Sequence, residues 1–140
     1  MCGIKIYTDG GSRGNPGPAA IALLIFDKKE RLLKTHSEYI GKTTNNVAEY
    51  RAVLKALEMA KSYRSGSILC TLDSQLVVNQ LSGKYVVKKQ HLRDLFKMVK
   101  EAEKSFDSVK YAFVPREDRR IQMADRLVNE MLDMVERTVR

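Results

Sequence analysis

The chain has 140 residues, of which 44% are hydrophobic and 30% charged, a composition typical of a globular domain rather than a disordered or fibrous chain. No apolar run approaches the roughly 18–20 residues that cross a bilayer, and the N-terminus lacks the layout of a signal peptide. We therefore expect one domain over residues 1–140, in the cytoplasm and without a membrane partner. The net charge of +8 favours polyanionic partners, although basic surfaces also occur on proteins that bind none.

Strand-forming residues dominate the first forty positions. Gly3–Thr8 and Ala20–Phe26 are predicted strands, and Arg31–Ile40 is a third, with Asp27–Glu30 as the turn before it. The next segment, Asn46–Tyr63, has the apolar spacing of a helix. The first half of the chain thus predicts an antiparallel meander followed by a helix.

The second half alternates helices with two more strands. Ser67–Leu72 and Val109–Val114 are predicted strands, separated by helices over Ser74–Leu81 and Leu92–Lys104. A last helix is indicated by an apolar stripe with i, i+3, i+4 spacing: Ala124, Leu127, Val128, Met131, Leu132 and Val135. The element order β-β-β-α-β-α-α-β-α predicts a mixed sheet with helices against its faces.

Glu49 is a carboxylate on the apolar side of a predicted helix. At about 100° per residue it falls in the arc that contains Val53 and Leu57, opposite the polar arc of Arg51 and Lys55. A glutamate is rarely buried unless it is paired, because removing a carboxylate from water is costly. A first-turn glutamate favoured by the helix dipole is the structural alternative. The arc in which Glu49 lies favours a functional role.

Three aspartates lie where predicted elements begin or end. Asp9 and Asp73 directly follow strands, with a sharp turn after Asp9, and Asp125 opens the last helix. Ligands gather outside the carboxyl ends of strands in open α/β sheets, although Asp73 and Asp125 are also suited to helix capping. Carboxylates that converge repel one another unless a cation is present, and Mg²⁺ prefers carboxylate and water ligands. Two such ions about 3.5–4 Å apart can stabilise both the attacking and the leaving oxygen of phosphoryl transfer.

Amide side chains accompany these carboxylates. Asn15 lies in the glycine-rich loop, Asn45 and Asn46 precede the predicted helix, and Gln75 follows the second strand-end aspartate. Amides both donate and accept hydrogen bonds, which suits sugar hydroxyls and base edges in an RNA minor groove. Asparagines are also ordinary helix caps, so these residues support the functional interpretation without establishing it.

The chain resembles the type 1 ribonuclease H family in four segments, which recur in the family's order and spacing: YTDGGSRGNPGPAA, TTNNVAEYRAVLKAL, LDSQLVVNQLSG and ADRLVNEM. The patterns TDG-S-x-GNPG and TNN-x-x-E are specific signals, whereas AD-x-L is weak alone. The resemblance covers nearly the whole chain. It implies an α/β ribonuclease H-like fold with a five-stranded mixed sheet in the order 3-2-1-4-5, flanked by helices.

The resemblance also implies an activity. Members of the family are endonucleases that hydrolyse the RNA strand of RNA–DNA hybrids with two Mg²⁺ ions, for which Mn²⁺ can substitute, leaving 5′-phosphate and 3′-hydroxyl ends. By position, Asp9, Glu49, Asp73 and Asp125 match the catalytic, metal-binding carboxylates. Asp9 would bridge the ions, Asp73 and Asp125 would hold the ion that activates water, and Glu49 would help hold the ion beside the leaving oxygen.

The resemblance further implies a set of substrate-binding positions: Gly10, Gly11, Ser12, Asn15, Thr44, Asn45, Asn46 and Gln75. Asn15 and Thr44 match the family's phosphate pocket, while Asn45 and Gln75 match its minor-groove contacts. Contacts to the 2′-hydroxyl would select the RNA strand, since that group distinguishes RNA from DNA.

The chain departs from the family pattern before its last aspartate. Many members carry a histidine there, but VPREDRRIQMAD has none, and His36 and His91 lie elsewhere. Arg116 can serve in that loop, as a phosphate contact or as a solvated charge, but arginine cannot be a general base. Ile121 stands where relatives often have an asparagine, four residues before Asp125.

A second departure lies in LSGKYVVKKQHL, which is too short for the basic helical handle of some members. Lys84, Lys88 and Lys89 remain available to contact a DNA strand, and Tyr85 takes a position often held by tryptophan. A solvated connector is the alternative interpretation.

Two other functions stay open at this stage. One is a ribonuclease H-like protein that binds hybrid or double-stranded RNA with weak or no cleavage, and the other is a Mg²⁺ nuclease that also cuts double-stranded RNA. We expect a monomer whose partner is an RNA–DNA hybrid. Cys2 and Cys70 lack metal-ligand spacing, and whether they pair is left open.

Overall fold

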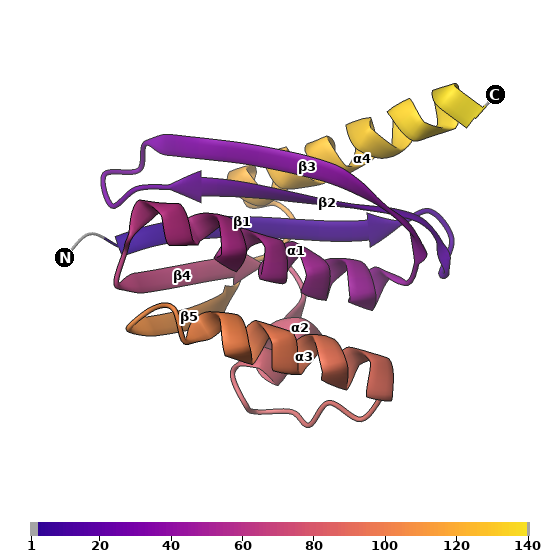
Figure 1. The fold of residues 1–140 in the computed structure, drawn as a ribbon. Helices are drawn as coiled ribbons and strands as arrows, with labels where there is room; N and C mark the ends of the chain where they lie inside the picture. Colours follow the sequence, from indigo (N-terminus) through magenta and orange to yellow (C-terminus); the bar gives the residue numbers. More distant parts are fainter. Residues whose placement is uncertain (1–2, 140) are drawn as a thin grey trace.

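The structure, a computed structural model, describes residues 3–139, without the side chain of Val139. Cys2 lies outside these residues, and with it the question of its pairing with Cys70. The strands are β1 (Gly3–Ser12), β2 (Gly17–Phe26), β3 (Leu32–Thr43), β4 (Ser67–Leu72) and β5 (Ser108–Phe113). They form one sheet in the order β3-β2-β1-β4-β5, in which β1 to β3 are antiparallel and β4 and β5 run parallel to β1 (Figure 1). The predicted strand order is confirmed.

Helices cover both faces of the sheet (Figure 1). The helical elements are α1 (Asn45–Ala60), a 3₁₀ turn η1 (Lys61–Tyr63), α2 (Gln75–Leu81), α3 (Gln90–Glu103) and α4 (Arg119–Val139). α1 packs against β1 with α3 beside it, and α4 crosses β1 and β2 on the opposite face. No helix within residues 3–139 is both long and apolar enough to cross a membrane.

The alternation of side chains along β2 divides the core between these two layers. Leu23 and Ile25 belong to the larger core under α1, whereas Ala20 and Ala22 face α4. Small alanines let α4 lie close to the sheet, where its buried residues Ala124, Val128 and Leu132 pack against them. Leu127 and Met131 pack against the same cluster, so the apolar stripe predicted for the last helix is confirmed except at Val135, which is half-buried and outside the cluster.

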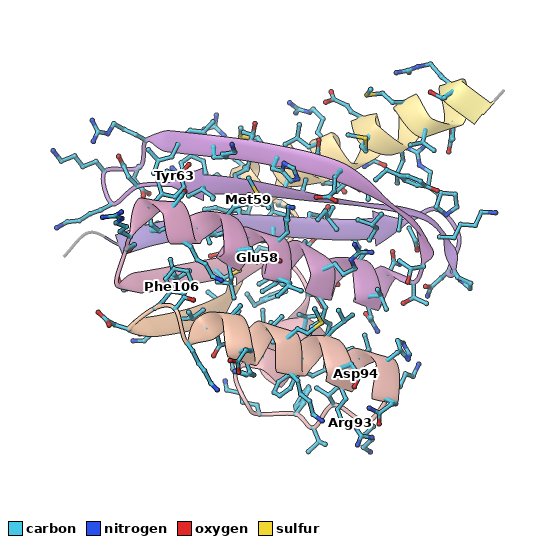
Figure 2. The ribbon with its side chains drawn as sticks, viewed as in Figure 1. Glu58, Met59, Tyr63, Arg93, Asp94 and Phe106 are labelled. Carbon is cyan, nitrogen blue, oxygen red and sulfur yellow. The ribbon has the colours of Figure 1, made fainter. Side chains whose placement is uncertain are left out.

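α1 presents its apolar arc to the sheet as predicted. Val53 and Leu57 are fully buried, while Glu58 is exposed and lies on the outer surface of the helix (Figure 2). Figure 2 also shows Met59 and Tyr63 near the end of this segment, where they pack against the core. The 3₁₀ turn follows α1 directly, so the predicted helix to Tyr63 is three residues too long as an α-helix.

The sharp turn predicted directly after Asp9 is wrong. β1 continues to Ser12, because Asp9 pairs with Ala22 and the ladder with β2 runs on as far as Ser12 opposite Ala19. The chain reverses over residues 13–16, where the backbone amide of Arg13 donates to the carbonyl of Pro18 at 2.8 Å. The two glycines after Asp9 have low strand propensity, but pairing with β2 overrides it.

The last helix also begins earlier than predicted. Asp118 caps it, since its Oδ1 accepts from the backbone amides of Arg120 at 2.9 Å and Ile121 at 3.1 Å. Asp125 therefore lies in the second turn of α4, not at its start. Similarly, Ser74 rather than Asp73 is the cap of α2, its Oγ accepting from the amide of Val77 at 3.3 Å.

Gly10 sets the distance between β1 and α1. A Cβ added to Gly10 would lie 2.8 Å from the backbone nitrogen of Glu49 and closer still to the carbonyl group of Ala48. Only a residue without a side chain allows the two backbones to approach in this way. The first turn of α1 is thereby brought against the strand that carries Asp9.

We predict that Gly10→Ala lowers the free energy of unfolding by about 1–3 kcal/mol, since the added methyl must displace backbone atoms. Gly11→Ala is the matched control, because its Cβ would meet Val128 Cγ1 at 3.8 Å and Asn45 Oδ1 at 3.9 Å, ordinary contact distances. The control should change the free energy of unfolding by no more than about 0.5 kcal/mol. Urea denaturation of both variants measures this difference, and equal losses would contradict the account of Gly10.

Candidate active site

A cavity of about 420 Å³ opens where β1 and β4 end. Its walls come from β1, the first two turns of α1, the junction of β4 with α2, the loop after β5, and α4. All four predicted carboxylates line it: Asp9, Glu49, Asp73 and Asp125. Elements distant in sequence thus bring acidic side chains to one place.

Three of these carboxylates form a compact cluster. Asp9, Glu49 and Asp73 each offer one oxygen, and these atoms all lie within 4.8 Å of one another. Asp125 reaches the same cavity from α4, and its negative charge is one of the causes that raise the pKa of Asp9. The structure therefore brings the first three together and places the fourth beside Asp9.

The sheet register and the end of β4 determine where the aspartates lie. Tyr7 of β1 pairs with Thr71 of β4 in the parallel ladder. Asp9 and Asp73 each follow these paired residues by two positions, so they lie side by side. β4 ends at Leu72 while β1 continues. The carboxylate of Asp73 is consequently at the end of its strand and next to a strand that runs past it.

Burial and mutual repulsion raise the pKa values of this cluster. Burial, followed by the negative charges of Asp73, Glu49 and Asp125, raises the pKa of Asp9 to about 8. Burial and the charge of Asp73 raise the pKa of Glu49 to about 7, against the opposing effects of a hydrogen bond from Ser74 and the charge of Arg116. The protein alone does not compensate these charges. A divalent cation would, and carboxylate oxygens are ligands that Mg²⁺ and Mn²⁺ prefer.

The predicted phosphate and minor-groove residues are joined to one another by hydrogen bonds. Asn45 Oδ1 accepts from the backbone amide of Ser12 at 2.8 Å and from its hydroxyl at 3.1 Å. Asn15 Oδ1 accepts from the amide of Asn45 at 3.0 Å, and Thr44 Oγ1 accepts from the amide of Val47 at 3.3 Å as the cap of α1. These contacts use the side-chain oxygens, and the amide NH₂ groups are the atoms that can donate to a nucleic acid.

The remaining predicted positions lie at different distances from the cavity. Gly10, Gly11, Ser12, Asn45 and Asn46 line it. Asn15, Thr44 and Gln75 are outside its described lining, with Asn15 and Gln75 exposed. The predicted positions therefore extend beyond the cavity.

Arg116 reaches the cluster from the loop after β5. Its Nε lies 3.7 Å from Asp73 Oδ2, while 88% of its side chain is exposed. The charge of Arg116 opposes the rise in the pKa of Asp73 that burial causes. The guanidinium is therefore close enough to act at the site and open to solvent on its other side.

The connector between α2 and α3 contains no helix, as predicted. Val87 is buried and anchors it, whereas Tyr85 and the lysines are exposed: Lys84, Lys88 and Lys89. The connector projects from the edge of the molecule below α3 (Figure 1). Contact of these residues with a DNA strand stays a prediction.

Two residues of the site were missed from the sequence. Ser74 caps α2 and also bonds to Glu49, which its place directly after Asp73 could have indicated. Arg13 lines the cavity and contacts α4, but its partners lie more than 100 residues away in sequence. No local pattern could have found that contact.

We predict that Asp9→Asn stabilises the metal-free protein at high pH. Because folding raises the pKa of Asp9, the folded state binds more protons than the unfolded state from about pH 4 to about pH 8, and stability falls as pH rises through this window. In EDTA above pH 8 the variant should be more stable than the unaltered protein by roughly 1–3 kcal/mol, with the two converging near pH 4.

Urea denaturation at several pH values measures this effect. Asp107→Asn, at an exposed position before β5, is the control and should show no such pH-dependent gain. A constant difference between Asp9→Asn and the unaltered protein from pH 4 to pH 8 would contradict the description of the cluster.

Comparison with known proteins agrees with this geometry. A family model described as reverse transcriptase-like matches residues 7–131. Ribonuclease HI of Halobacterium salinarum is 38% identical over 130 residues, which cover 93% of this chain and 64% of that protein. Bifunctional protein Rv2228c of Mycobacterium tuberculosis is 37% identical over 131 residues, which cover 93% of this chain. The chain thus spans 35% of the length of the mycobacterial relative.

Solved structures show the same fold. The N-terminal RNase H domain of Rv2228c, solved as a fusion with maltose-binding protein, superposes with a TM-score of 0.92 at 35% identity, and each chain is covered completely. LC11-RNase H1, solved in complex with an RNA/DNA hybrid, gives a TM-score of 0.88 at 40% identity over 94% of this chain and 98% of that one. With the matching family model, the relatives and the sheet order, the chain belongs to the type 1 ribonuclease H family.

Proposed function

We propose that this protein is an endonuclease that hydrolyses the RNA strand of RNA–DNA hybrids in the cavity between β1 and α4. The observation that carries the proposal is the convergence of Asp9, Glu49 and Asp73 within 4.8 Å, with raised pKa values. The similarity to LC11-RNase H1, which was solved with an RNA/DNA hybrid, supports the choice of substrate.

The donor set of the cluster fits a divalent cation. Asp9, Glu49 and Asp73 would hold Mg²⁺, or Mn²⁺ in its place, through carboxylate oxygens. Asp9, whose pKa is raised by the charges of Asp73, Glu49 and Asp125, would help to hold both ions. When bound, such ions lower the pKa of coordinated water and stabilise charge on the phosphate oxygens.

The chain's own residues place the substrate for hydrolysis. Water would attack the phosphorus atom while the bond to the 3′ oxygen breaks, leaving a 5′-phosphate and a 3′-hydroxyl end. By the family resemblance, we assign Asp73 and Asp125 to the attacking water and Glu49 to the leaving oxygen. Arg116, exposed and 3.7 Å from Asp73, would contact the phosphate as a fixed positive charge.

Selectivity for the RNA strand would rest on the amide groups at the start of α1. Asn45 and Asn46 line the cavity and can donate to sugar hydroxyls, which distinguish RNA from DNA. Asn15 and Thr44 flank this position and would hold a neighbouring phosphate, and Gln75 would contact the minor groove from α2. Because these residues extend beyond the cavity, they suit a duplex rather than a mononucleotide.

Binding without cleavage is less well supported, since all four carboxylates line one cavity. Cleavage of double-stranded RNA stays a prediction for a substrate panel. The monomeric state, the cytoplasmic location and the single domain over residues 1–140 also stay predictions.

We predict Mg²⁺-dependent cleavage of a labelled RNA–DNA hybrid, reduced by about a hundredfold or more in Asp9→Asn, because the shared carboxylate is lost. Product ends can be identified by phosphatase sensitivity of the newly formed 5′ end. Asp107→Asn serves as the folded control and should retain full activity. Strong cleavage by Asp9→Asn would exclude the assigned site, and binding of hybrid without product at any Mg²⁺ or Mn²⁺ concentration would favour the binding-only function.

A further inference from the structure

The side chain of Arg13 joins the β1–β2 turn to α4. Its Nη2 lies 2.8 Å from Asp133 Oδ1, and its Nη1 lies 2.7 Å from Glu136 Oε1. Nη2 also donates to the carbonyl oxygen and to Oδ1 of Asn129, each at 3.3 Å. Both terminal nitrogens of the guanidinium are thus engaged by a single helix.

These partners lie in one row along α4 with Asp125. Asn129 follows Asp125 by four residues and Asp133 by another four, so they share a face of the helix. The side-chain amide of Asn129 donates to the carbonyl oxygen of Asp125 at 3.0 Å. A chain of hydrogen bonds therefore runs from Arg13 through Asn129 to the turn that carries Asp125.

This row is distinct from the apolar stripe that attaches α4 to the sheet. The stripe residues Ala124, Val128 and Leu132 are buried against β2. The row lies one residue further along the helix, at Asp125, Asn129 and Asp133, and Glu136 is about one turn after the last of these. The apolar stripe holds the helix against the sheet. Contacts to one side of the stripe oppose rotation of the helix about its axis.

The same turn is also attached to α1. Ser12 and Asn15 hydrogen-bond to Asn45 at the start of that helix. α1 and α4 lie on opposite faces of the sheet (Figure 1), and they supply Glu49 and Asp125 respectively. The turn consequently connects two helices that each carry a carboxylate of the site.

We propose that Arg13 is a positioning residue, which holds α4 against the β1–β2 turn so that Asp125 keeps its place beside Asp9. The proposal rests on the hybrid-cleaving function proposed above. Asp125 depends on such support because it is exposed, whereas Asp9 is 8% exposed and fixed within the sheet. A displacement of about 1 Å in a catalytic group can cost up to a hundredfold in rate.

The competing role for a basic residue in this loop is direct contact with a substrate phosphate. Asp133 and Glu136 argue against it, because they compensate the charge of Arg13 and occupy its donors. The two roles give opposite results when these acids are neutralised. If Arg13 contacts a substrate phosphate, removal of the acids frees its guanidinium for that contact. If Arg13 positions α4, removal of the acids breaks the contact that holds the helix.

The test compares Arg13→Ala with the double variant Asp133→Asn/Glu136→Gln and with the triple variant that combines them. If Arg13 positions α4, each should lower kcat about tenfold and raise the Mg²⁺ concentration for half-maximal rate, with KM for the hybrid unchanged. The kcat of the triple variant should fall no further than that of Arg13→Ala or of the double variant, because all three residues act in one contact. Arg13→Lys, which retains one ion pair, should keep an intermediate kcat.

The control is Glu130→Gln/Asp107→Asn, which removes two exposed negative charges, one of them on α4, neither of which is an ion-pair partner of Arg13. It should leave kcat and the Mg²⁺ dependence unchanged. The melting temperature of Arg13→Ala and of the double and triple variants should fall by only about 2–4 °C, because partly exposed ion pairs contribute little to stability. Loss of kcat at temperatures well below melting then reports on position rather than on unfolding.

Two results would overturn the proposal. The first is an unchanged kcat in Arg13→Ala. The second is a pair of binding results in EDTA: Asp133→Asn/Glu136→Gln binds the hybrid more tightly than the charge-matched control does, and Arg13→Ala binds it more weakly than the unaltered protein. If the unaltered protein does not cleave the hybrid, the proposed function fails separately. The positioning role of Arg13 is then judged by calorimetric titration with Mg²⁺. Arg13→Ala should bind Mg²⁺ several-fold more weakly than the unaltered protein, and equal binding would reject the positioning role.

Discussion

The repulsion among three carboxylates that are largely removed from water is the constraint on which this structure depends. Asp9, Glu49 and Asp73 come from a strand, a helix and a strand end, and their oxygen atoms lie within 4.8 Å of one another. Such a cluster opposes folding unless the surrounding scaffold is stable enough to hold it. The scaffold does so by burying long apolar faces on both sides of the sheet, and at Gly10 by letting two backbones approach each other.

That constraint also explains the surroundings of the cluster. Ser74 and Arg116 oppose the raised pKa of Glu49, but neither removes the excess of negative charge. We propose that a divalent cation supplies the remaining compensation, because carboxylate oxygens are ligands that Mg²⁺ and Mn²⁺ prefer. The net charge of +8 favours polyanionic partners in general, whereas the site itself is acidic.

Much of the fold and of the site could be predicted from the sequence. Glu49 was identified as unusual because its place on an apolar arc is a local property that helical periodicity reveals. The strand order and the pairing of Asp9 with distant carboxylates came from the family resemblance, since no periodicity specifies which strands are neighbours. The end of β1 was wrong because cross-strand pairing with Ala22 outweighs the low strand propensity of glycine.

The start of α4 shows the same limit. Asp118 and Asp125 are both suitable as helix caps, but the backbone amides at the start of α4 donate to Asp118. Arg13 was not identified at all, because its function depends on α4 packing across the sheet and bringing Asp133 within reach. Local signals thus predicted which residues are chemically unusual, whereas tertiary packing determines how they are supported.

The carboxylate cluster is proposed to bind a divalent cation. Carbon-13 NMR of the side-chain carboxyl groups during titration with Mg²⁺ tests this binding most directly. We expect the resonances of Asp9, Glu49 and Asp73 to shift together as Mg²⁺ is added, and their raised pKa values to fall in its presence. Carboxyl resonances of these three residues that do not respond to Mg²⁺, with pKa values unchanged, would contradict the account.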